Sequence, residues 1–195
     1  AGHDYPLVDG HMSNQVYIDS FTRIWEQNKK VNHTDSSDYA ALTFHLPYTK
    51  MGRKALRAIF SEMSEEEQQR LEARYDEAVV YSRQVGNLYT GSLYLGLMSL
   101  LDNGDLAAGD RIGLFSYGSG AVSEFFSMTL MDDYKTYLSI EENQALLSSR
   151  QQLSIDGYEA MFNKKLPTDG ETYTFSDYTA YAINKISGDI RYYNK

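Results

Sequence analysis

The sequence predicts a layered α/β domain, and three observations support that class. Two apolar, β-rich runs lie on either side of a glycine turn at residues 116–120, a third strand-like run covers 41–46, and segments with helical periodicity separate or follow them. Elements in this order bury their apolar faces by stacking in layers. With 195 residues and 42% hydrophobic residues, the chain is expected to form a single domain over 1–195.

The overall charge excludes several function classes. The formal net charge is −9 at pH 7, and neither nucleic acid nor an anionic membrane is an expected partner, because both require a basic surface. No apolar run reaches the roughly 18 residues that cross a bilayer. The chain opens on Ala1 without Met or a signal-like region, so we expect a cytoplasmic protein and a chain cut from a longer one.

The chain contains no cysteine. It therefore has no disulfide, thiolate metal site or cysteine nucleophile of its own. His3, His11 and His33 show no ligand spacing, so no metal site is expected.

The first third of the chain predicts a helix, a strand and a second helix. Ser13 is a suitable N-cap for a helix to about Val31, whose apolar stripe recurs at spacings of four and three. A short strand at 41–46 ends at Pro47. Pro47 also opens a helix from about Tyr48 to Phe60.

The middle of the chain predicts two longer helices. Ser64 and Glu67 form a capping-box pattern that starts a helix running to about Gln84. After a break at Gly86-Asn87, residues 90–101 leave almost no polar face, which predicts a helix buried in the centre of a domain.

The remaining segments follow in order. Strands are expected at 112–116 and 122–130, both buried, then short helices at 134–138, 141–150 and 154–164, and finally a hairpin of 178–186 with 190–193 around Ser187-Gly188.

The turn Ser116-Tyr117-Gly118-Ser119-Gly120 is the first candidate for chemistry. Two glycines one residue apart permit positive φ and a close approach to main-chain N–H donors, which is how an oxyanion hole is built. An ordinary tight hairpin without chemistry is the favoured alternative on the motif alone.

Two polar side chains are further candidates. His45 lies at the end of the 41–46 strand, where ligands bind in α/β sheets, and could orient a substrate oxygen or exchange a proton. A core histidine bonded to a backbone carbonyl is an equal alternative. Asn87 could donate its amide to a carbonyl oxygen, although a helix-capping or turn role is favoured.

A row of cations forms a fourth candidate. Lys50, Arg53, Lys54 and Arg57 fall at i, i+3, i+4 and i+7, so they share one helix face. They could contact a phosphate or CoA near the helix N-terminus, but a solvated helix face is the favoured interpretation.

Three stretches together resemble one family. Phe44-His45-Leu-Pro47-Tyr-Thr-Lys50, Val85-Gly-Asn87-Leu-Tyr-Thr-Gly-Ser92 and Gly113-Leu-Phe-Ser-Tyr-Gly-Ser-Gly120 look like the C-terminal half of hydroxymethylglutaryl-CoA synthase, bacterial type, in order and spacing. The resemblance implies a thiolase-like, layered α/β/α fold built of two similar halves, a homodimer, and the condensation of acetyl-CoA with acetoacetyl-CoA in the mevalonate route to isoprenoids. It implies no cofactor beyond these CoA thioester substrates.

The resemblance also implies residue roles. His45 would bind and polarise the acetoacetyl oxygen, Asn87 would hold a substrate carbonyl, and the backbone N–H of Ser119 would be an oxyanion donor beside a wall shaped by Tyr117 and Gly118. The implied CoA contact is Lys50, with Arg53, Lys54 and Arg57 as lesser candidates.

The sequence departs from the family in one decisive respect. The family's cysteine nucleophile and glutamate base belong to the N-terminal half, so this chain alone is expected to be inactive and to leave a broad apolar face bare. Two alternatives stay open: a related synthase that installs β-branches on polyketides held by an acyl carrier protein, and a non-catalytic scaffold that kept the fold.

Overall fold

A computed structural model describes residues 9–118, 120–179 and 181–194. The chain forms two compact units, Ala1–Ser148 and Ser149–Lys195. Composition alone did not predict this division, and the assignment of residues 1–195 to one half-domain of a larger enzyme stays a prediction.

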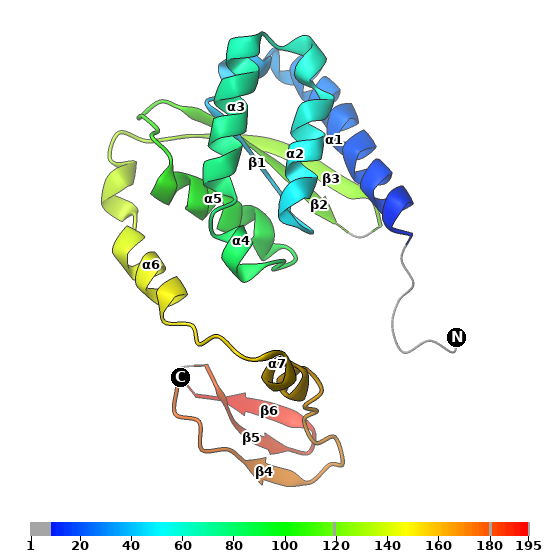
Figure 1. Ribbon diagram of the computed structural model, residues 1–195, viewed down its shortest axis with the longest axis vertical. Helices are drawn as coiled ribbons and strands as arrows, with labels where there is room; N and C mark the ends of the chain where they lie inside the picture. Colours follow the sequence, from blue (N-terminus) through cyan, green and yellow to red (C-terminus); the bar gives the residue numbers. More distant parts are fainter. Residues whose placement is uncertain (1–8, 119, 180, 195) are drawn as a thin grey trace. The chain divides into compact units, whose positions relative to one another are not determined.

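The first unit contains a three-stranded sheet and the helices that cover it (Figure 1). Its elements are α1 Gly10–Asn32, η1 Ser36–Asp38, β1 Ala41–Phe44, α2 Thr49–Ala58, η2 Phe60–Glu62, α3 Glu65–Ala78, α4 Ser82–Val85, α5 Gly91–Asn103, β2 Arg111–Gly118, β3 Val122–Thr129, η3 Tyr134–Tyr137 and α6 Ile140–Ser148. The strand order is β1-β2-β3, with β1 parallel to β2 and β2 antiparallel to β3.

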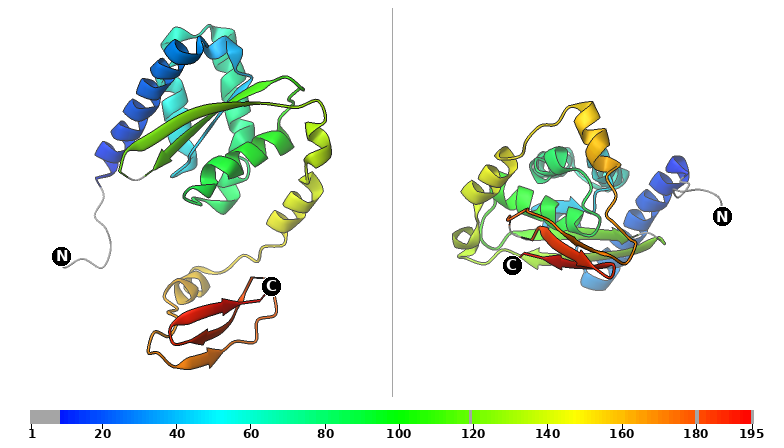
Figure 2. Two further views of the ribbon diagram at one scale, coloured as in Figure 1. Left: turned by 180° about the vertical axis from the view of Figure 1, so that it is seen from behind. Right: turned by 90° about the horizontal axis from the view of Figure 1, so that it is seen from below.

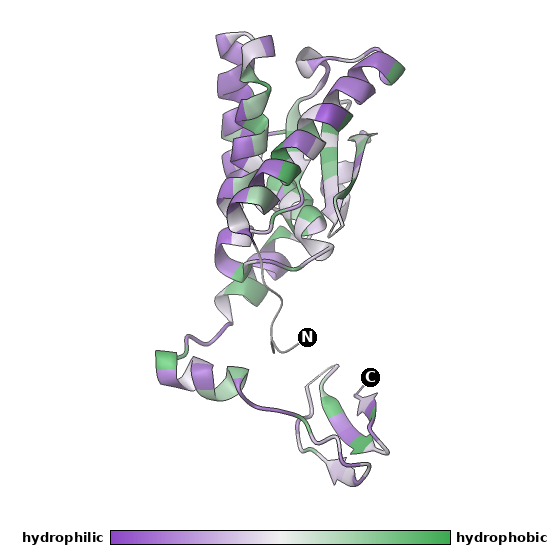
Figure 3. Cartoon of the chain, turned by 90° about the vertical axis from the view of Figure 1, so that its right-hand side faces the viewer, coloured by the Kyte–Doolittle hydropathy of each residue, from purple (hydrophilic) through white to green (hydrophobic). Residues whose placement is uncertain are grey.

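Alternating residues of the strands build two separate cores, one on each face of the sheet. On one face, Leu42, Phe44 and Phe115 pack with the apolar stripes of α1, α2 and α3. On the other face, Ile112 and Leu114 pack with α5. Figures 2 and 3 show helices on both sides of the sheet and hydrophobic stretches along its strands. This arrangement confirms the expected layered α/β/α class.

Aromatic rings fill the core under α1. Phe115 makes edge-to-face contacts with Tyr17 and Phe21, with ring centroids 5.2 and 5.1 Å apart, and also with Phe44 at 6.2 Å. Trp25 extends the cluster at 6.2 Å from Phe21. The apolar stripe predicted for the first helix therefore packs on this face of the sheet, against residues of β1 and β2.

The first helix begins earlier than expected. Asp9, not Ser13, is the N-cap, because its carboxylate accepts hydrogen bonds from the N–H groups of His11 and Met12, both at 3.0 Å. A carboxylate at this position also complements the positive end of the helix dipole.

The helix expected at 64–84 is two helices. Its start is confirmed, since Ser64 and Glu67 form the capping box, but α3 stops at Ala78 and α4 covers only Ser82–Val85. Ser99 of α5 accounts for the break. Its hydroxyl donates to the carbonyl of Glu77 at 2.6 Å and accepts from the N–H of Tyr81 at 3.3 Å, so α5 replaces the intrahelical bonds.

The expectation that 90–101 is buried all round is wrong for this unit. Leu93 and Leu100 of α5 are buried, whereas Tyr94 is 56% exposed. Together with Leu97, Met98 and Leu101, Tyr94 lines a groove of about 340 Å³ that Tyr137 and Leu138 close on the other side. The apolar residues of α5 that lie outside the core therefore line this groove.

The hairpin of β2 and β3 is confirmed, but only β2 is buried. Its residues 112–115 are fully buried, while β3 alternates between exposed and half-buried positions as an edge strand does. Gly113 lies where the two strands and β1 approach closely. A Cβ at this position would lie 2.5 Å from Leu42 Cδ2 and 2.6 Å from Phe125 Cζ.

Replacing Gly113 by alanine is expected to lower the free energy of unfolding by about 1–3 kcal/mol, because two packed side chains must move to admit one methyl group. The matched control is Gly118→Ala in the same strand, where the nearest atom is 3.9 Å from the added Cβ. Urea unfolding of both variants measures the difference. Equal midpoints for the two variants would contradict the packing argument.

The second unit contains α7 Ile155–Phe162 and an antiparallel sheet of β4 Thr172–Thr174, β5 Ile183–Ser187 and β6 Ile190–Tyr193. The hairpin around Ser187-Gly188 is confirmed, but β4 was not predicted. The expected strand start at 178 is wrong, because Asp177 accepts from Thr179 N–H and Oγ1 and forms a turn instead. None of the helices in the described part of the chain is long and apolar enough to cross a membrane.

Candidate active site

The carboxyl ends of β1 and β2 bring two of the predicted residues together. His45 directly follows β1, and Tyr117 lies near the end of β2, with ring centroids 6.5 Å apart. The N–H of His45 donates to the carbonyl of Phe115 at 2.7 Å, and its own carbonyl accepts from the hydroxyl of Tyr17 at 2.6 Å. The sheet and α1 therefore hold both backbone groups of His45.

The imidazole of His45 is half-buried. Burial is the main cause that lowers its pKa from 6.5, and a hydrogen bond with the backbone of Tyr89 opposes it. Because that bond favours the charged ring, the backbone group is the Tyr89 carbonyl, which accepts from the imidazole. The ring is thus neutral at pH 7. The bond to a carbonyl agrees with the core-histidine alternative, and the position directly after β1 is the one that the functional alternative requires; the functional role itself stays a prediction.

His45 is expected to make the first unit less stable in mild acid. Its pKa in the folded chain lies below 6.5, so the unfolded chain binds more protons just below that pH, and stability falls as the pH falls through this window. We expect His45→Gln to lose less unfolding free energy than the wild type between about pH 7 and pH 5.5.

Urea unfolding at the two pH values measures this difference. His11→Gln is the control, because His11 is exposed on α1. Parallel pH dependence in wild type and His45→Gln would show that burial of His45 does not perturb its titration.

Asn87 lies in the loop between α4 and α5 and supports both interpretations made from the sequence. Its Oδ1 accepts from the N–H of Tyr89 at 2.7 Å and from Oγ of Ser92 at 3.1 Å, which is a capping turn at the start of α5. Within the described residues its Nδ2 has no hydrogen-bond partner. The amide nitrogen is therefore available to donate to a ligand.

The loop that carries Asn87 has an unusual backbone. Gly86 has φ 84° and Tyr89 has φ 52°, the latter in a region that costs an aromatic residue energy. The bonds from Tyr89 to Asn87 and to His45 hold this conformation.

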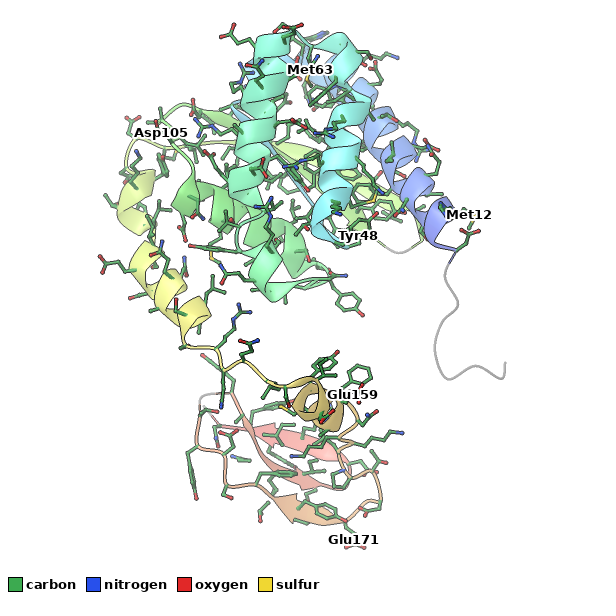
Figure 4. All side chains as sticks on the ribbon, in the orientation of Figure 1. Met12, Tyr48, Met63, Asp105, Glu159 and Glu171 are labelled. Carbon is green, nitrogen blue, oxygen red and sulfur yellow. The ribbon has the colours of Figure 1, made fainter. Side chains whose placement is uncertain are left out.

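A pocket of about 270 Å³ lies beside this loop. It is bounded by the segment that follows His45 and by the end of α4, and its lining is Leu46, Pro47, Tyr48, Thr49, Ser82, Arg83, Gly86 and Asn87. Tyr48, labelled in Figure 4 at the start of α2, donates to Oδ1 of Asn14 on α1 at 2.9 Å. The pocket is thus lined by Asn87 and by Leu46, the residue that follows His45, whereas His45 itself is not part of the lining.

The cation row on α2 divides into two groups. Arg53 pairs with Asp76 at 2.5 Å and Arg57 with Glu72 at 2.6 Å, so these two guanidinium groups bind α3. Lys54 donates to the hydroxyl of Tyr48 at 3.2 Å, and Lys50 is exposed. Among the described residues neither lysine forms an ion pair, which leaves Lys50 and Lys54 as the cations free to meet an anion.

The turn after β2 has part of the predicted geometry. Gly120 has φ 93° and Ala121 has φ 58°, whereas Gly118 belongs to β2. Ser119, the predicted oxyanion donor, lies outside the described residues. Tyr117 packs against Tyr17 with ring centroids 5.0 Å apart, which positions it beside His45.

Sequence reasoning missed two supporting residues. These are Tyr17 of the first helix and Ser92, which the sequence alone marks only as the end of the stretch from Val85 to Ser92. The signal for both was present, because a buried phenol or serine hydroxyl requires a polar partner. The described residues contain no group of three or more His, Asp or Glu side chains that could hold a metal ion.

Comparisons with known proteins point to one family. The family model described as "Hydroxymethylglutaryl-coenzyme A synthase C terminal" matches residues 2–73 and 57–180. A hydroxymethylglutaryl-CoA synthase of Enterococcus faecalis is 54% identical over 194 residues, covering 99% of this chain and 50% of that protein. A crystal structure of an HMG-CoA synthase complexed with CoA has a TM-score of 0.90 at 35% identity, covering 100% of this chain and 52% of that chain.

A second kind of relative is more distant. A polyketide biosynthesis 3-hydroxy-3-methylglutaryl-ACP synthase of Bacillus subtilis is 31% identical over 170 residues, covering 82% of this chain and 39% of that protein.

The fold and these likenesses define the chain as part of a thiolase-like protein. The chain belongs to the hydroxymethylglutaryl-CoA synthase family and corresponds to its C-terminal region. It spans about half the length of the relatives it matches.

Proposed function

We propose that this chain is the acetoacetyl-CoA-binding half of an enzyme that condenses acetyl-CoA with acetoacetyl-CoA to hydroxymethylglutaryl-CoA. The observation that carries the proposal is a series of contacts at the ends of β1 and β2: the Tyr117 ring lies 6.5 Å from the His45 ring, the His45 ring bonds the Tyr89 backbone, and the N–H of Tyr89 donates to Asn87, whose Nδ2 has no partner among the described residues. We also propose that the enzyme is a cytoplasmic homodimer of the mevalonate pathway and uses no cofactor besides its CoA thioester substrates, as the family resemblance implies.

The reaction would proceed as follows. A carbanion derived from the acetyl group attacks the ketone carbon of acetoacetyl-CoA, and negative charge develops on the ketone oxygen. The N–H of the neutral His45 ring is held by the Tyr89 carbonyl, so His45 would act in its protonated form. The second N–H of the imidazolium would hydrogen-bond that oxygen and pass its proton to the alkoxide, which leaves a neutral imidazole and an alcohol, while Nδ2 of Asn87 would donate to a substrate carbonyl. Donors that are already oriented stabilise developing charge most effectively. The backbone N–H of Ser119 would be a further oxyanion donor, and Tyr117 and Gly118 would shape the wall beside it.

The CoA portion would approach from α2. Lys50 and Lys54 lack ion pairs within the described chain and would meet the CoA phosphates. Arg53 and Arg57 are held by α3 carboxylates, so we propose a smaller part for Arg53 than its spacing suggested. Because two of the four cations on α2 are paired with carboxylates of α3, the helix has no long basic surface for an acidic carrier protein. This favours CoA as the carrier of the substrate over the acyl carrier protein of the polyketide alternative.

The other half of the protein would supply what this chain lacks. A chain with no cysteine cannot form the acyl-enzyme, and relatives are about twice as long. The apolar groove along α5 has the composition of an intramolecular interface. We propose that the N-terminal half carries the nucleophile and the glutamate base and covers this face of α5.

A chimera tests the proposed function. The N-terminal half of the Enterococcus faecalis relative, joined to this chain, should release CoA from acetyl-CoA and acetoacetyl-CoA, whereas either half alone should not. The intact Enterococcus faecalis enzyme is the positive control. A folded, acetylated chimera that hydrolyses acetyl-CoA but never condenses it would contradict the proposal.

The same chimera distinguishes the polyketide alternative, which the Bacillus subtilis relative supports. An acetoacetyl group on CoA should be the better acceptor. A clear preference for acetoacetyl on an acyl carrier protein would replace our assignment with the polyketide one, and a folded chimera without either activity would favour the non-catalytic scaffold.

A further inference from the structure

Ser92 is a buried serine in the first turn of α5, 1% exposed. Its Oγ accepts from the N–H of Leu88 at 2.8 Å and lies 3.1 Å from Oδ1 of Asn87. A hydroxyl has a single proton, and Leu88 already donates to the oxygen. The proton of Ser92 is therefore directed at Asn87.

This proton acts together with the N–H of Tyr89 to set which way the Asn87 amide faces. Oδ1 receives two donors, Ser92 Oγ and the N–H of Tyr89. The reversed amide would place its NH₂ group against the N–H of Tyr89, which cannot accept, and would turn the Ser92 hydroxyl away from the donor role it has here. Nδ2 is then the other branch of the carboxamide, and it has no hydrogen-bond partner within the described residues. Asn87 lines the pocket together with Leu46 and Pro47.

The same contacts reach His45. Oδ1 of Asn87 accepts a hydrogen bond from the N–H of Tyr89 at 2.7 Å, and the Tyr89 backbone hydrogen-bonds the His45 ring. A chain of bonds from Ser92 through Asn87 and Tyr89 thus ends at the imidazole.

We propose that Ser92 is a positioning residue that orients the Asn87 amide toward a substrate carbonyl and, through Tyr89, steadies the imidazole of His45. The inference rests on the proposed function, because it assigns a task to the site described there. Ser92 itself touches no reacting atom.

Ser92→Ala is the test variant, and Ser99→Ala is its matched control. Ser99 is also buried on α5 and bridges two backbone groups, but these belong to the α3–α4 break. Both variants are expected to lower the thermal midpoint. In the chimera, Ser92→Ala should raise KM for acetoacetyl-CoA about 10-fold, whereas Ser99→Ala should leave it unchanged.

Nuclear magnetic resonance of the 195-residue chain supplies a readout that does not depend on activity. Ser92→Ala should shift the side-chain NH₂ resonances of Asn87, assigned with Asn87→Asp, and change the pH titration of the His45 ring. Ser92→Thr, which keeps the hydroxyl, should restore both. Ser92→Cys keeps a similar volume with a weaker donor, and it should show the same changes if the alanine variant does not fold.

Two failures are distinguishable. A chimera without condensation in its wild-type form would overturn the proposed function, while the Asn87 resonances would still report on the Ser92 bond. An active chimera whose KM and Asn87 resonances do not change in Ser92→Ala or Ser92→Cys would overturn the role of Ser92 alone.

Discussion

Replacing His45 by alanine in the chimera is expected to reduce condensation about 100-fold or more, the loss typical when a positioned acid–base group is removed. The effect should be confined to one step. Acetylation of the cysteine depends on the other half, so it should continue at the wild-type rate when acetyl-CoA is supplied alone. The substituted ring is half-buried and bonded to Tyr89, and it contacts the substrate only in the second step of the proposed reaction.

Single-turnover measurements separate the two steps. Mass spectrometry follows acetylation of the protein, and CoA release after acetoacetyl-CoA is added follows condensation. His11→Ala is the control, since His11 is exposed at the start of α1 and has no part in the proposed site. A His45→Ala chimera that condenses at the wild-type rate would remove His45 from the mechanism.

The second large effect concerns stability. Phe115→Ala is expected to lower the free energy of unfolding of the first unit by about 3–5 kcal/mol, as phenylalanine truncations in cores do. Phe115 is 0% exposed and contacts four other aromatic rings, those of Tyr17, Phe21, Phe44 and Tyr117. The cavity would lie between α1 and the sheet, where no neighbouring element can close it without breaking these contacts.

Urea unfolding followed by the fluorescence of Trp25 measures this loss, because Trp25 is in the same cluster and is the only tryptophan in the chain. Tyr137→Ala is the control, since Tyr137 is 78% exposed. A loss below about 1 kcal/mol for Phe115→Ala, typical of surface substitutions, would show that the cluster contributes little to the fold.

The elements that sequence predicted well are those determined by local chemistry. The capping box of Ser64 and Glu67 and the glycine turn at Gly120 depend on residues within a few positions of one another. The end of β1, at Phe44 and three residues before Pro47, has the same origin, although the strand expected from the sequence ran on to residue 46. Local signals also placed His45 at the end of the first strand, because the residue lies between a strand-like run and Pro47 in the sequence.

The features that sequence missed depend on contacts between distant segments. The break after Ala78 requires Ser99, and the pairing of Arg53 requires Asp76 on the next helix. Spacing on α2 showed that four cations share a face, but not that a neighbouring helix presents carboxylates to two of them. Likewise, Asn87 could be called a turn residue or a donor from sequence, and only the contacts with Tyr89 and Ser92 show that its oxygen caps the turn while Nδ2 has no partner among the described residues.

The double anchoring of His45 has a consequence for ligand affinity. Tyr17 and Phe115 hydrogen-bond the backbone of His45, and the Tyr89 backbone bonds its ring. His45 therefore loses its conformational freedom when the chain folds and not when a ligand binds. A ligand that meets the ring then loses only its own freedom of motion. Immobilising one such side chain during binding would cost about 0.5–1.5 kcal/mol, so the aromatic core under α1 contributes to affinity without touching the ligand.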